Sequence, residues 1–203
     1  MESKRAVAGD PLDPRAMRRH CHAMNRIAIV GCSGGGKSTL ARALSAKLNL
    51  PIIHLDVIFW RPGWIEGDAD EMLAQVETAV MAERWVCEGN FVRASALRLR
   101  RADAIVWIDQ PRLTCLRRAI WRALTGFGRD RPDLAPGCPE RIDFAFYSYI
   151  WNWNRLTRPR IEAAIAAHAP NTPVIRLGGD REVAAWLASL DRRSETAART
   201  RMA

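Results

Sequence analysis

The sequence lacks several features that would identify a membrane or secreted protein. None of its apolar runs approaches the ~20 residues that a membrane-spanning helix needs, and its polar first 25 residues contain no apolar signal segment. The five cysteines are odd in number and widely spaced, with no CxxC pair, so neither a zinc site nor a disulfide framework is indicated. These absences predict a protein of the reducing cytoplasm without a membrane partner.

The two ends of the chain also lack hydrophobic periodicity. Residues 1–24 and 191–203 are predicted to be flexible tails around one domain at 25–190.

The chain carries a net charge of +9, and residues 112–160 hold ten arginines against four acidic residues. Such a block suits polyphosphate, nucleic acid or an anionic surface. The use of arginine rather than lysine favours bidentate clamping of phosphate.

Apolar strands alternate with amphipathic segments between the tails. This order predicts an α/β fold with a parallel sheet covered by helices on both faces. A loop rich in glycine and proline at 127–140 indicates a mobile insertion at about 126–142. The expected strands are 27–30, 51–56, 84–89, 104–109 and 173–177, and the main expected helices are 37–48, 69–83 and one that begins near 140, with Pro159 breaking it.

The stretch GCSGGGKS at 31–38 fits G-x-x-x-x-G-K-[ST] at every fixed position, after a strand and before a helix. Its backbone N–H groups would surround a β-phosphate at the positive end of the helix dipole. Lys37 would reach the β- and γ-phosphates, the Ser38 hydroxyl would coordinate Mg²⁺, and Thr39 would reach the α-phosphate. The predicted nucleotide-binding residues are Gly31, Ser33, Gly34, Gly35, Gly36, Lys37, Ser38 and Thr39.

The motif predicts a nucleoside triphosphate, and other absences narrow the class of protein. The sequence has neither the DxxG nor the NKxD expected of a GTPase, and none of its expected strands ends in the Asp-Glu of a motor ATPase. A compact kinase that uses ATP and Mg²⁺ is therefore the favoured interpretation.

Further motifs carry a resemblance. HLD at 54–56, WVCEGNF at 85–91 and IDQP at 108–111, with the arginine-rich insertion, resemble the adenylate-kinase-like nucleoside monophosphate kinases. HLDVIFWRPGW, RPDLAPGCPERID and IWNWNRLTRPRI resemble a bacterial group described as DNA topology modulation proteins or adenylate-kinase-related kinases. The resemblance covers about residues 26–178. It implies a three-layer P-loop NTPase fold with a five-stranded parallel sheet, helices on both faces and a lid insertion.

The resemblance also implies roles for individual arginines. Arg118 would stack on adenine, and Arg122, four residues on, would bind phosphate. Arg141 and Arg155 would clamp the phosphoryl group in transit, so that Lys37, Arg122, Arg141 and Arg155 are the catalytic candidates. Arg129 and Arg131 lie in the lid and would close over the nucleotide.

Three residues are the candidates for the acceptor side. Glu88 stands where the kinases usually have the aspartate that helps to hold Mg²⁺. Asp56 would take Mg²⁺ through water or act as a base toward an acceptor hydroxyl. Arg93 resembles the arginine that holds the acceptor's phosphate, displaced by one position. The predicted metal site is thus Ser38, Asp56 and Glu88.

Several interpretations stay open at this level. His54 is either a packed or hydrogen-bonded histidine or a base, and for Asp109 a role as a helix cap alone stays open. Trp60, Trp64, Trp151 and Trp153 are either core residues or the lining of an acceptor pocket. The chain is either a phosphotransferase with a nucleotide or other small-molecule acceptor, or a nucleic-acid-associated ATPase or regulatory nucleotide-binding protein without kinase activity. Neither the acceptor nor the oligomeric state follows from the sequence.

Overall fold

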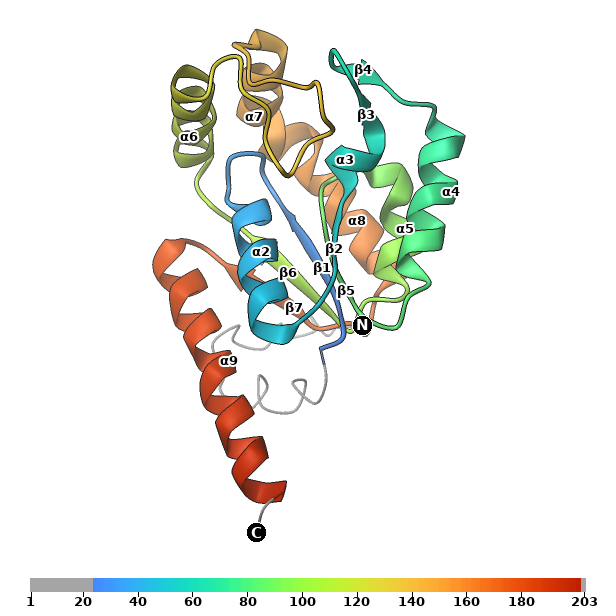
Figure 1. The fold of residues 1–203 in the computed structure, drawn as a ribbon, viewed down its shortest axis with the longest axis vertical. Coiled ribbons are helices and arrows are strands. Elements are labelled where there is room, and N and C mark those ends of the chain that lie inside the picture. Colours follow the sequence, from blue (N-terminus) through green and yellow to red (C-terminus); the bar gives the residue numbers. More distant parts are fainter. Residues whose placement is uncertain (1–23, 202–203) are drawn as a thin grey trace, which may run out of the picture.

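The computed structural model describes residues 24–201, so most of the predicted N-terminal tail lies outside the described residues. The main sheet has five parallel strands in the order β2-β5-β1-β6-β7 (Figure 1). Its strands are β1 Arg26–Gly31, β2 Ile52–His54, β5 Trp85–Glu88, β6 Ala104–Ile108 and β7 Val174–Leu177. The five-stranded parallel sheet with flanking helices confirms the predicted fold class.

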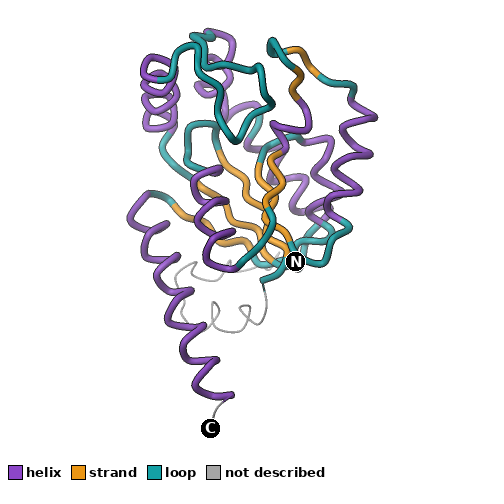
Figure 2. The backbone as a smooth tube through the Cα atoms, viewed as in Figure 1, coloured by secondary structure: helices purple, strands orange, loops and turns teal. Residues whose placement is uncertain are grey.

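Helices follow the strands and cover both faces of the sheet (Figure 2). A short antiparallel hairpin of β3 Trp60–Arg61 and β4 Ile65–Glu66 stands apart from the main sheet. Within the described residues, no helix is both long enough and apolar enough to span a bilayer. The helices are α2 Lys37–Leu48, α3 Leu55–Phe59, α4 Ala69–Val80, the 3₁₀ helix η1 Val92–Ala94, α5 Ser95–Leu99, α6 Arg112–Thr125, α7 Phe144–Leu156, α8 Arg158–His168 and α9 Asp180–Arg201.

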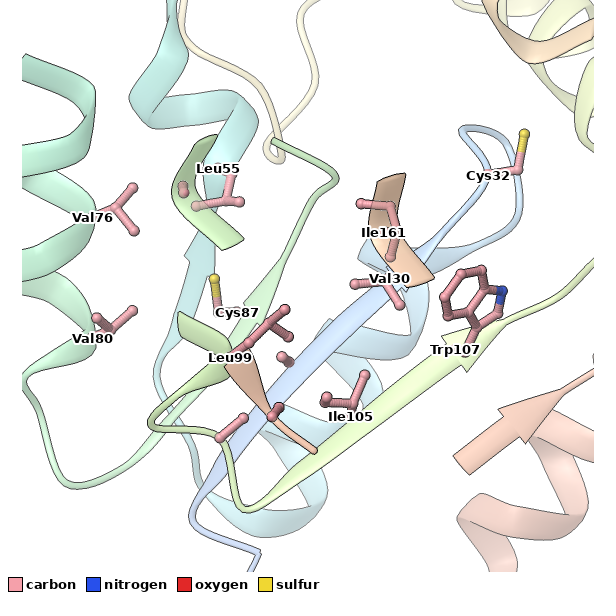
Figure 3. Packing of buried hydrophobic residues seen from close by; sticks show 14 of the residues in the cluster. Val30, Cys32, Leu55, Val76, Val80, Cys87, Leu99, Ile105, Trp107 and Ile161 are labelled. Atoms are coloured by element: carbon pink, nitrogen blue, oxygen red, sulfur yellow. The ribbon is translucent and has the colours of Figure 1, made fainter. Parts of the chain in front are cut away.

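Two hydrophobic cores form because successive residues of a strand point to opposite faces of the sheet. Ile27 and Ile29 of β1 lie in the core shared with α2 and α9, and Ala28 and Val30 lie in the core under α4, α5, α7 and α8. Figure 3 shows Val30 in this second core, on the same face as Ile161 of α8. The buried strands explain why the sequence reads as continuous apolar runs.

Two expected elements differ from the structure. The expected strand 51–56 ends at His54, because Leu55 and Asp56 begin the short helix α3. The helix expected from about 140 starts later, at Phe144, after Asp143, whose side chain accepts a hydrogen bond from the Phe146 amide over 3.0 Å. It breaks near Pro159 as expected, because Pro159 lies in the first turn of α8, where a missing N–H has no cost.

The segment 126–143 between α6 and α7 packs against the β3–β4 hairpin (Figure 1). It is anchored by hydrogen bonds from the Gly63 amide to the Gly137 oxygen, over 2.7 Å, and from Trp64 Nε1 to the Pro139 oxygen, over 2.9 Å. Trp60 and Trp64 pack on its three buried residues, whereas Trp153 is a core residue and Trp151 is 46% exposed. Two of these four tryptophans therefore pack on the segment, one lies in the core and one is largely open to solvent. The buried residues of the segment are Leu134, Ala135 and Cys138.

Candidate active site

The glycine-rich loop connects β1 to α2 at the carboxyl end of the sheet. Gly34 has a φ of 81°, and a Cβ atom there would collide with the backbone oxygen of Cys115 at the start of α6. Gly36 precedes α2 with a φ of 101° and supplies no side-chain cap. The first N–H groups of α2 therefore have no side-chain acceptor at the N-cap, which leaves them available to an anion.

Lys37 is buried at the start of α2, with 9% of its surface exposed. Its Nζ donates a hydrogen bond to the backbone oxygen of Cys32 over 3.3 Å, so the ammonium group lies inside the curve of the loop. The buried ammonium group attracts phosphate oxygens, to which the N–H groups at the start of α2 can donate hydrogen bonds.

Ser38, Glu88 and His54 form a hydrogen-bonded chain beside the loop. Ser38 Oγ donates to Glu88 Oε1 over 3.1 Å, and His54 Nδ1 lies 2.8 Å from the same oxygen. Glu88 is 1% exposed. Burial by itself would raise its pKa, but the hydrogen bond from His54 and the charge of Lys37 bring the pKa below its ordinary value. Glu88 is thus an anion at neutral pH, and His54 is hydrogen-bonded, as one of its two interpretations expects.

Asp56 lies in the first turn of α3 and is half-buried. Removal of its carboxyl group from water raises the pKa of Asp56 to about 6, and the negative charge of Glu88 raises it further. Lys37 and Arg131 act in the opposite direction. A carboxylate with a pKa near neutrality is suited to accept a proton in catalysis.

Asp133 is a site residue that the sequence motifs did not reveal. It lies in the segment 126–143 and is 8% exposed. Burial would raise the pKa of Asp133, but the charge of Arg131 and a hydrogen bond from Ser38 lower it. Asp133 therefore lies near the Ser38 hydroxyl, as Glu88 does. Its position in an irregular loop, without periodicity, leaves no sequence signal for this contact.

Asn90 is the second residue that sequence reasoning missed. Its Nδ2 donates to the Gly31 oxygen over 2.7 Å, and its Oδ1 accepts from the Gly31 amide over 3.3 Å. The side-chain amide therefore pairs with the backbone of Gly31 as a neighbouring strand would. It fixes the first residue of the loop, and its place in the stretch WVCEGNF is the signal that the sequence offers.

The two predicted nucleotide-binding arginines of α6 are held by carboxylates. Arg118 forms an ion pair with Asp180 at the start of α9. Arg122 Nε lies 2.6 Å from Glu140 Oε1, and Arg131 Nη1 lies 2.9 Å from the same oxygen. Burial and the nearby charge of Arg131 lower the pKa of Arg122. Glu140, which is 6% exposed, therefore pairs with both guanidinium groups from within the segment 126–143.

Other predicted residues are not brought into this cluster. Arg141 pairs with Asp143 over 2.9 Å, and its guanidinium lies 5.1 Å from the centre of the Trp64 ring. Among the described residues, neither Arg93 nor Arg155 forms a hydrogen bond, ion pair or ring contact with another side chain, and both are exposed. Thr39 is also exposed.

Asp109 makes a bidentate ion pair with Arg158, with N–O distances of 2.9 and 3.0 Å. It therefore joins β6 to α8 rather than serving only as a helix cap.

The oxygen atoms around Ser38 suit a magnesium ion. Mg²⁺ prefers oxygen ligands and is commonly held by one or two carboxylates together with phosphates and water. Ser38 with Glu88 supplies a hydroxyl and an anionic carboxylate of this kind. In residues 24–201 no group of three or more histidine, cysteine, aspartate or glutamate side chains is arranged to hold a metal ion by itself. A cation here would thus need oxygens from a bound phosphate.

Comparisons with known proteins show the fold. No protein-family model and no curated protein matches the sequence. The shikimate kinase from Acinetobacter baumannii in complex with shikimate is similar over 86% of this chain and 94% of its own, with a TM-score of 0.53 and 12% identity. Shikimate kinase from Aquifex aeolicus is 18% identical, covering 83% of this chain and 98% of its own, with a TM-score of 0.48. The likeness to the Acinetobacter enzyme shows the fold alone, and the chain has the P-loop fold of that structure.

Proposed function

We propose that the protein is a P-loop kinase that transfers the γ-phosphoryl group of ATP to a hydroxyl group of a small-molecule acceptor. The observation that carries this proposal is the hydrogen-bonded chain from Ser38 through Glu88 to His54, placed directly beside the glycine-rich loop. It joins a phosphate-binding helix terminus to an anionic carboxylate. These are the parts that phosphoryl transfer from a magnesium–nucleotide complex requires.

On the donor side, the loop amides and Lys37 bind the β- and γ-phosphates. Ser38 and Glu88 hold Mg²⁺, which neutralises charge on the phosphate oxygens when it is bound. Arg118 leaves its ion pair with Asp180 and stacks on the adenine. Arg122, freed from Glu140, contacts a phosphate. The ion pairs thus hold these arginines until a nucleotide replaces the carboxylates.

On the acceptor side, Asp56 receives the hydroxyl proton as the acceptor oxygen bonds to the γ-phosphorus. The bond from that phosphorus to the β-phosphate oxygen breaks, and ADP leaves with the electron pair. The raised pKa of Asp56 and its coupling to Lys37 and Glu88 support this role. Arg93 is displaced by one position from the arginine that holds the acceptor's phosphate in the kinases that the sequence resembles, so a hydroxyl compound without a phosphate is favoured over a nucleoside monophosphate.

The segment 126–142 acts as a lid in this proposal, within a domain at 25–190. Arg131 influences the pKa of Asp56 and is therefore already near the acceptor side. Arg129, Arg141 and Arg155 would move toward the phosphates when the lid closes. Closure excludes water and so favours transfer to the acceptor over hydrolysis of ATP.

On its sequence motifs, we also propose that the protein belongs to the bacterial DNA topology modulation-like group. We further propose that it is cytoplasmic. A role as a nucleic-acid-associated ATPase has less support. Three of the arginines in the basic block, Arg118, Arg122 and Arg158, are held by carboxylates of the same chain. They are not part of a free basic stripe that would follow a phosphate backbone.

ADP formation with a panel of nucleosides, nucleotides and hydroxylated metabolites tests the proposal. We expect one class of acceptor to raise ADP formation well above the rate in water alone, and Lys37→Ala to abolish the increase. If no acceptor raises the rate and a salt-resistant complex with duplex DNA stimulates hydrolysis instead, the kinase proposal fails.

A further inference from the structure

Helix α6 presents its large apolar side chains to solvent and its small ones to the protein. Cys115, Ala119 and Ala123, spaced at four residues, are all buried, with at most 2% exposed. On the outer side Leu113 and Trp121 are 64% and 68% exposed. This is the reverse of the usual arrangement of a surface helix. We call the outward residues the α6 apolar face; they are Leu113, Ile120, Trp121, Leu124 and Phe127.

The α6 apolar face has the size of the largest apolar patch on a typical soluble monomer, and such patches are often functional. Within α6, Leu113 and Ile120 are seven residues apart, Ile120 and Leu124 are four apart, and Trp121 is adjacent to Ile120, so these four form one stripe along the helix, whereas Phe127 lies two residues beyond its end. A shallow groove of about 350 Å³ runs along it, lined by Leu113, Leu116, Arg117, Ile120, Trp121 and Leu124. From the usual sizes of these side chains, the exposed fractions correspond to roughly 500 Å² of apolar area, near the upper limit of what monomers leave open. A face of this extent indicates a contact surface.

The charges on α6 indicate the kind of partner. The helix contains four arginines and no acidic residue. Arg118 and Arg122 point to carboxylates within the protein, but Arg117 is exposed and, among the described residues, pairs with no acidic side chain. Arg112 is exposed and lies over the Trp151 ring at 4.2 Å. The charge beside the apolar face is therefore positive and uncompensated on its own helix.

This charge disfavours a second copy of the chain as the partner. Two α6 faces in contact would bring arginines together without opposing acids on the helices, and the chain already carries +9. An exposed tryptophan, leucines and a phenylalanine beside arginines are instead the composition of helices that lie on anionic lipid surfaces. Arginines near such a surface strengthen the attraction to its negative charge.

We propose, in place of the expectation of no membrane partner, that the α6 apolar face binds a bilayer surface that carries anionic phospholipid headgroups. In this proposal, Trp121, Leu124 and Phe127 enter the region between headgroups and acyl chains, and Arg117 contacts the phosphates. Helix α6 lies at the outer edge of the molecule (Figures 1 and 2), so a flat surface can reach it. The phosphate loop contacts the opposite side of α6, at Cys115, and stays open to nucleotide.

Sedimentation of the full chain with vesicles tests this proposal independently of kinase activity. We expect binding to phosphatidylcholine vesicles that contain phosphatidylglycerol, little binding to phosphatidylcholine alone, and weaker binding as salt increases. The double variant Trp121→Ser, Leu124→Ser should bind at least ~10-fold more weakly. Met81→Ser, which removes a 59% exposed apolar side chain at the end of α4, is the matched control and should bind as the wild type does.

Arg117→Gln serves as a second variant because it leaves the apolar packing intact. It should weaken binding to the anionic vesicles, whereas Arg100→Gln, at another exposed arginine, should not. The proposal is wrong if anionic vesicles bind no more protein than neutral ones, or if the Met81 variant loses as much binding as the double variant. Concentration-dependent dimers that the double variant loses, without vesicle binding, would assign the face to a second copy instead.

Discussion

The Ser38 hydroxyl donates a hydrogen bond to the carboxylate of Glu88, 3.1 Å away, and thereby joins the start of α2 to the end of β5. The kinases that the sequence resembles usually have an aspartate where this chain has Glu88. The longer side chain reaches the serine of the loop directly. A cation bound to Ser38 would therefore lie within reach of an anionic glutamate, and this relationship supports the predictions that follow.

Replacing Lys37 tests the donor side. Lys37→Met keeps the length of the side chain but removes the charge that faces the phosphates. We expect acceptor-dependent turnover to fall by roughly 10²–10³-fold, the usual effect of removing one preorganised electrostatic contact. Lys47→Met, at the other end of the same helix, is the control and should change the rate less than twofold. Equal losses in the two variants would contradict the assigned role.

Asp56→Asn tests the proposed base. The folded-state pKa of about 6 lies above the usual value of 3.8, so ionised Asp56 opposes folding, and its cost develops as pH rises from about 4 to 6. The variant should lose turnover yet gain about 1–3 kcal/mol of unfolding free energy at pH 7, and less at pH 4. Urea unfolding at both pH values measures this difference. A variant that is less stable at pH 7 would contradict the raised pKa.

The same carboxylate predicts a pH profile for the wild-type enzyme. Because protonated Asp56 cannot accept the hydroxyl proton, kcat/KM for the acceptor should rise with pH through about 6 and then level off. Initial rates between pH 5 and 8 measure this. A profile that is flat across this range would exclude Asp56 as the base.

The role of Glu88 predicts a dependence on magnesium. Glu88→Gln keeps the hydrogen bond to Ser38 but removes the anionic oxygen, so half-maximal activity should need about 10-fold more Mg²⁺. His54→Ala removes a hydrogen bond that lowers the pKa of Glu88, so its Mg²⁺ requirement should increase more at pH 5.5 than at pH 8. Glu71→Gln, whose carboxylate pairs with Arg61 on the surface, is the control. Unchanged Mg²⁺ titrations for all three variants would remove Glu88 from the metal site.

The contact between the segment 126–143 and the β3–β4 hairpin gives a local prediction. Trp64→Phe removes the hydrogen bond to the Pro139 oxygen, worth about 1 kcal/mol. Proteolytic cleavage within 127–137 should accelerate several-fold while the global unfolding midpoint changes little. Trp151→Phe, at an exposed position on α7, should leave cleavage unchanged. Equal cleavage of wild type and Trp64→Phe would show that the contact does not hold the segment.

The sequence predicts best what local patterns determine. The glycine-rich loop, the buried strands and the cap of α4 depend on neighbours in the chain. Asp68 accepts hydrogen bonds from the amides of Asp70 and Glu71, at 3.0 and 2.9 Å, which is the usual contact of an aspartate placed directly before a helix. Such features follow from backbone geometry and need no knowledge of the tertiary contacts.

Contacts between distant residues could not be predicted in this way. Asn90 pairs with Gly31 across 59 residues, and Asp133 reaches Ser38 from a loop without periodicity. Helix α6 is a different case, because its pattern shows an apolar stripe but not which side of the helix the domain covers. The small residue Cys115 faces inward, where Gly34 and Gly35 of the glycine-rich loop approach α6 closely.

The destination of the γ-phosphoryl group tests the central claim most directly. The protein is incubated with ATP labelled at the γ-phosphate and with each hydroxylated acceptor, and the label in organic product is compared with the label in inorganic phosphate. We predict that most of the label enters one class of acceptor, and that Lys37→Met and Asp56→Asn both abolish this transfer. Release of the label only as inorganic phosphate, with every acceptor and at the same rate as in water, would contradict the account.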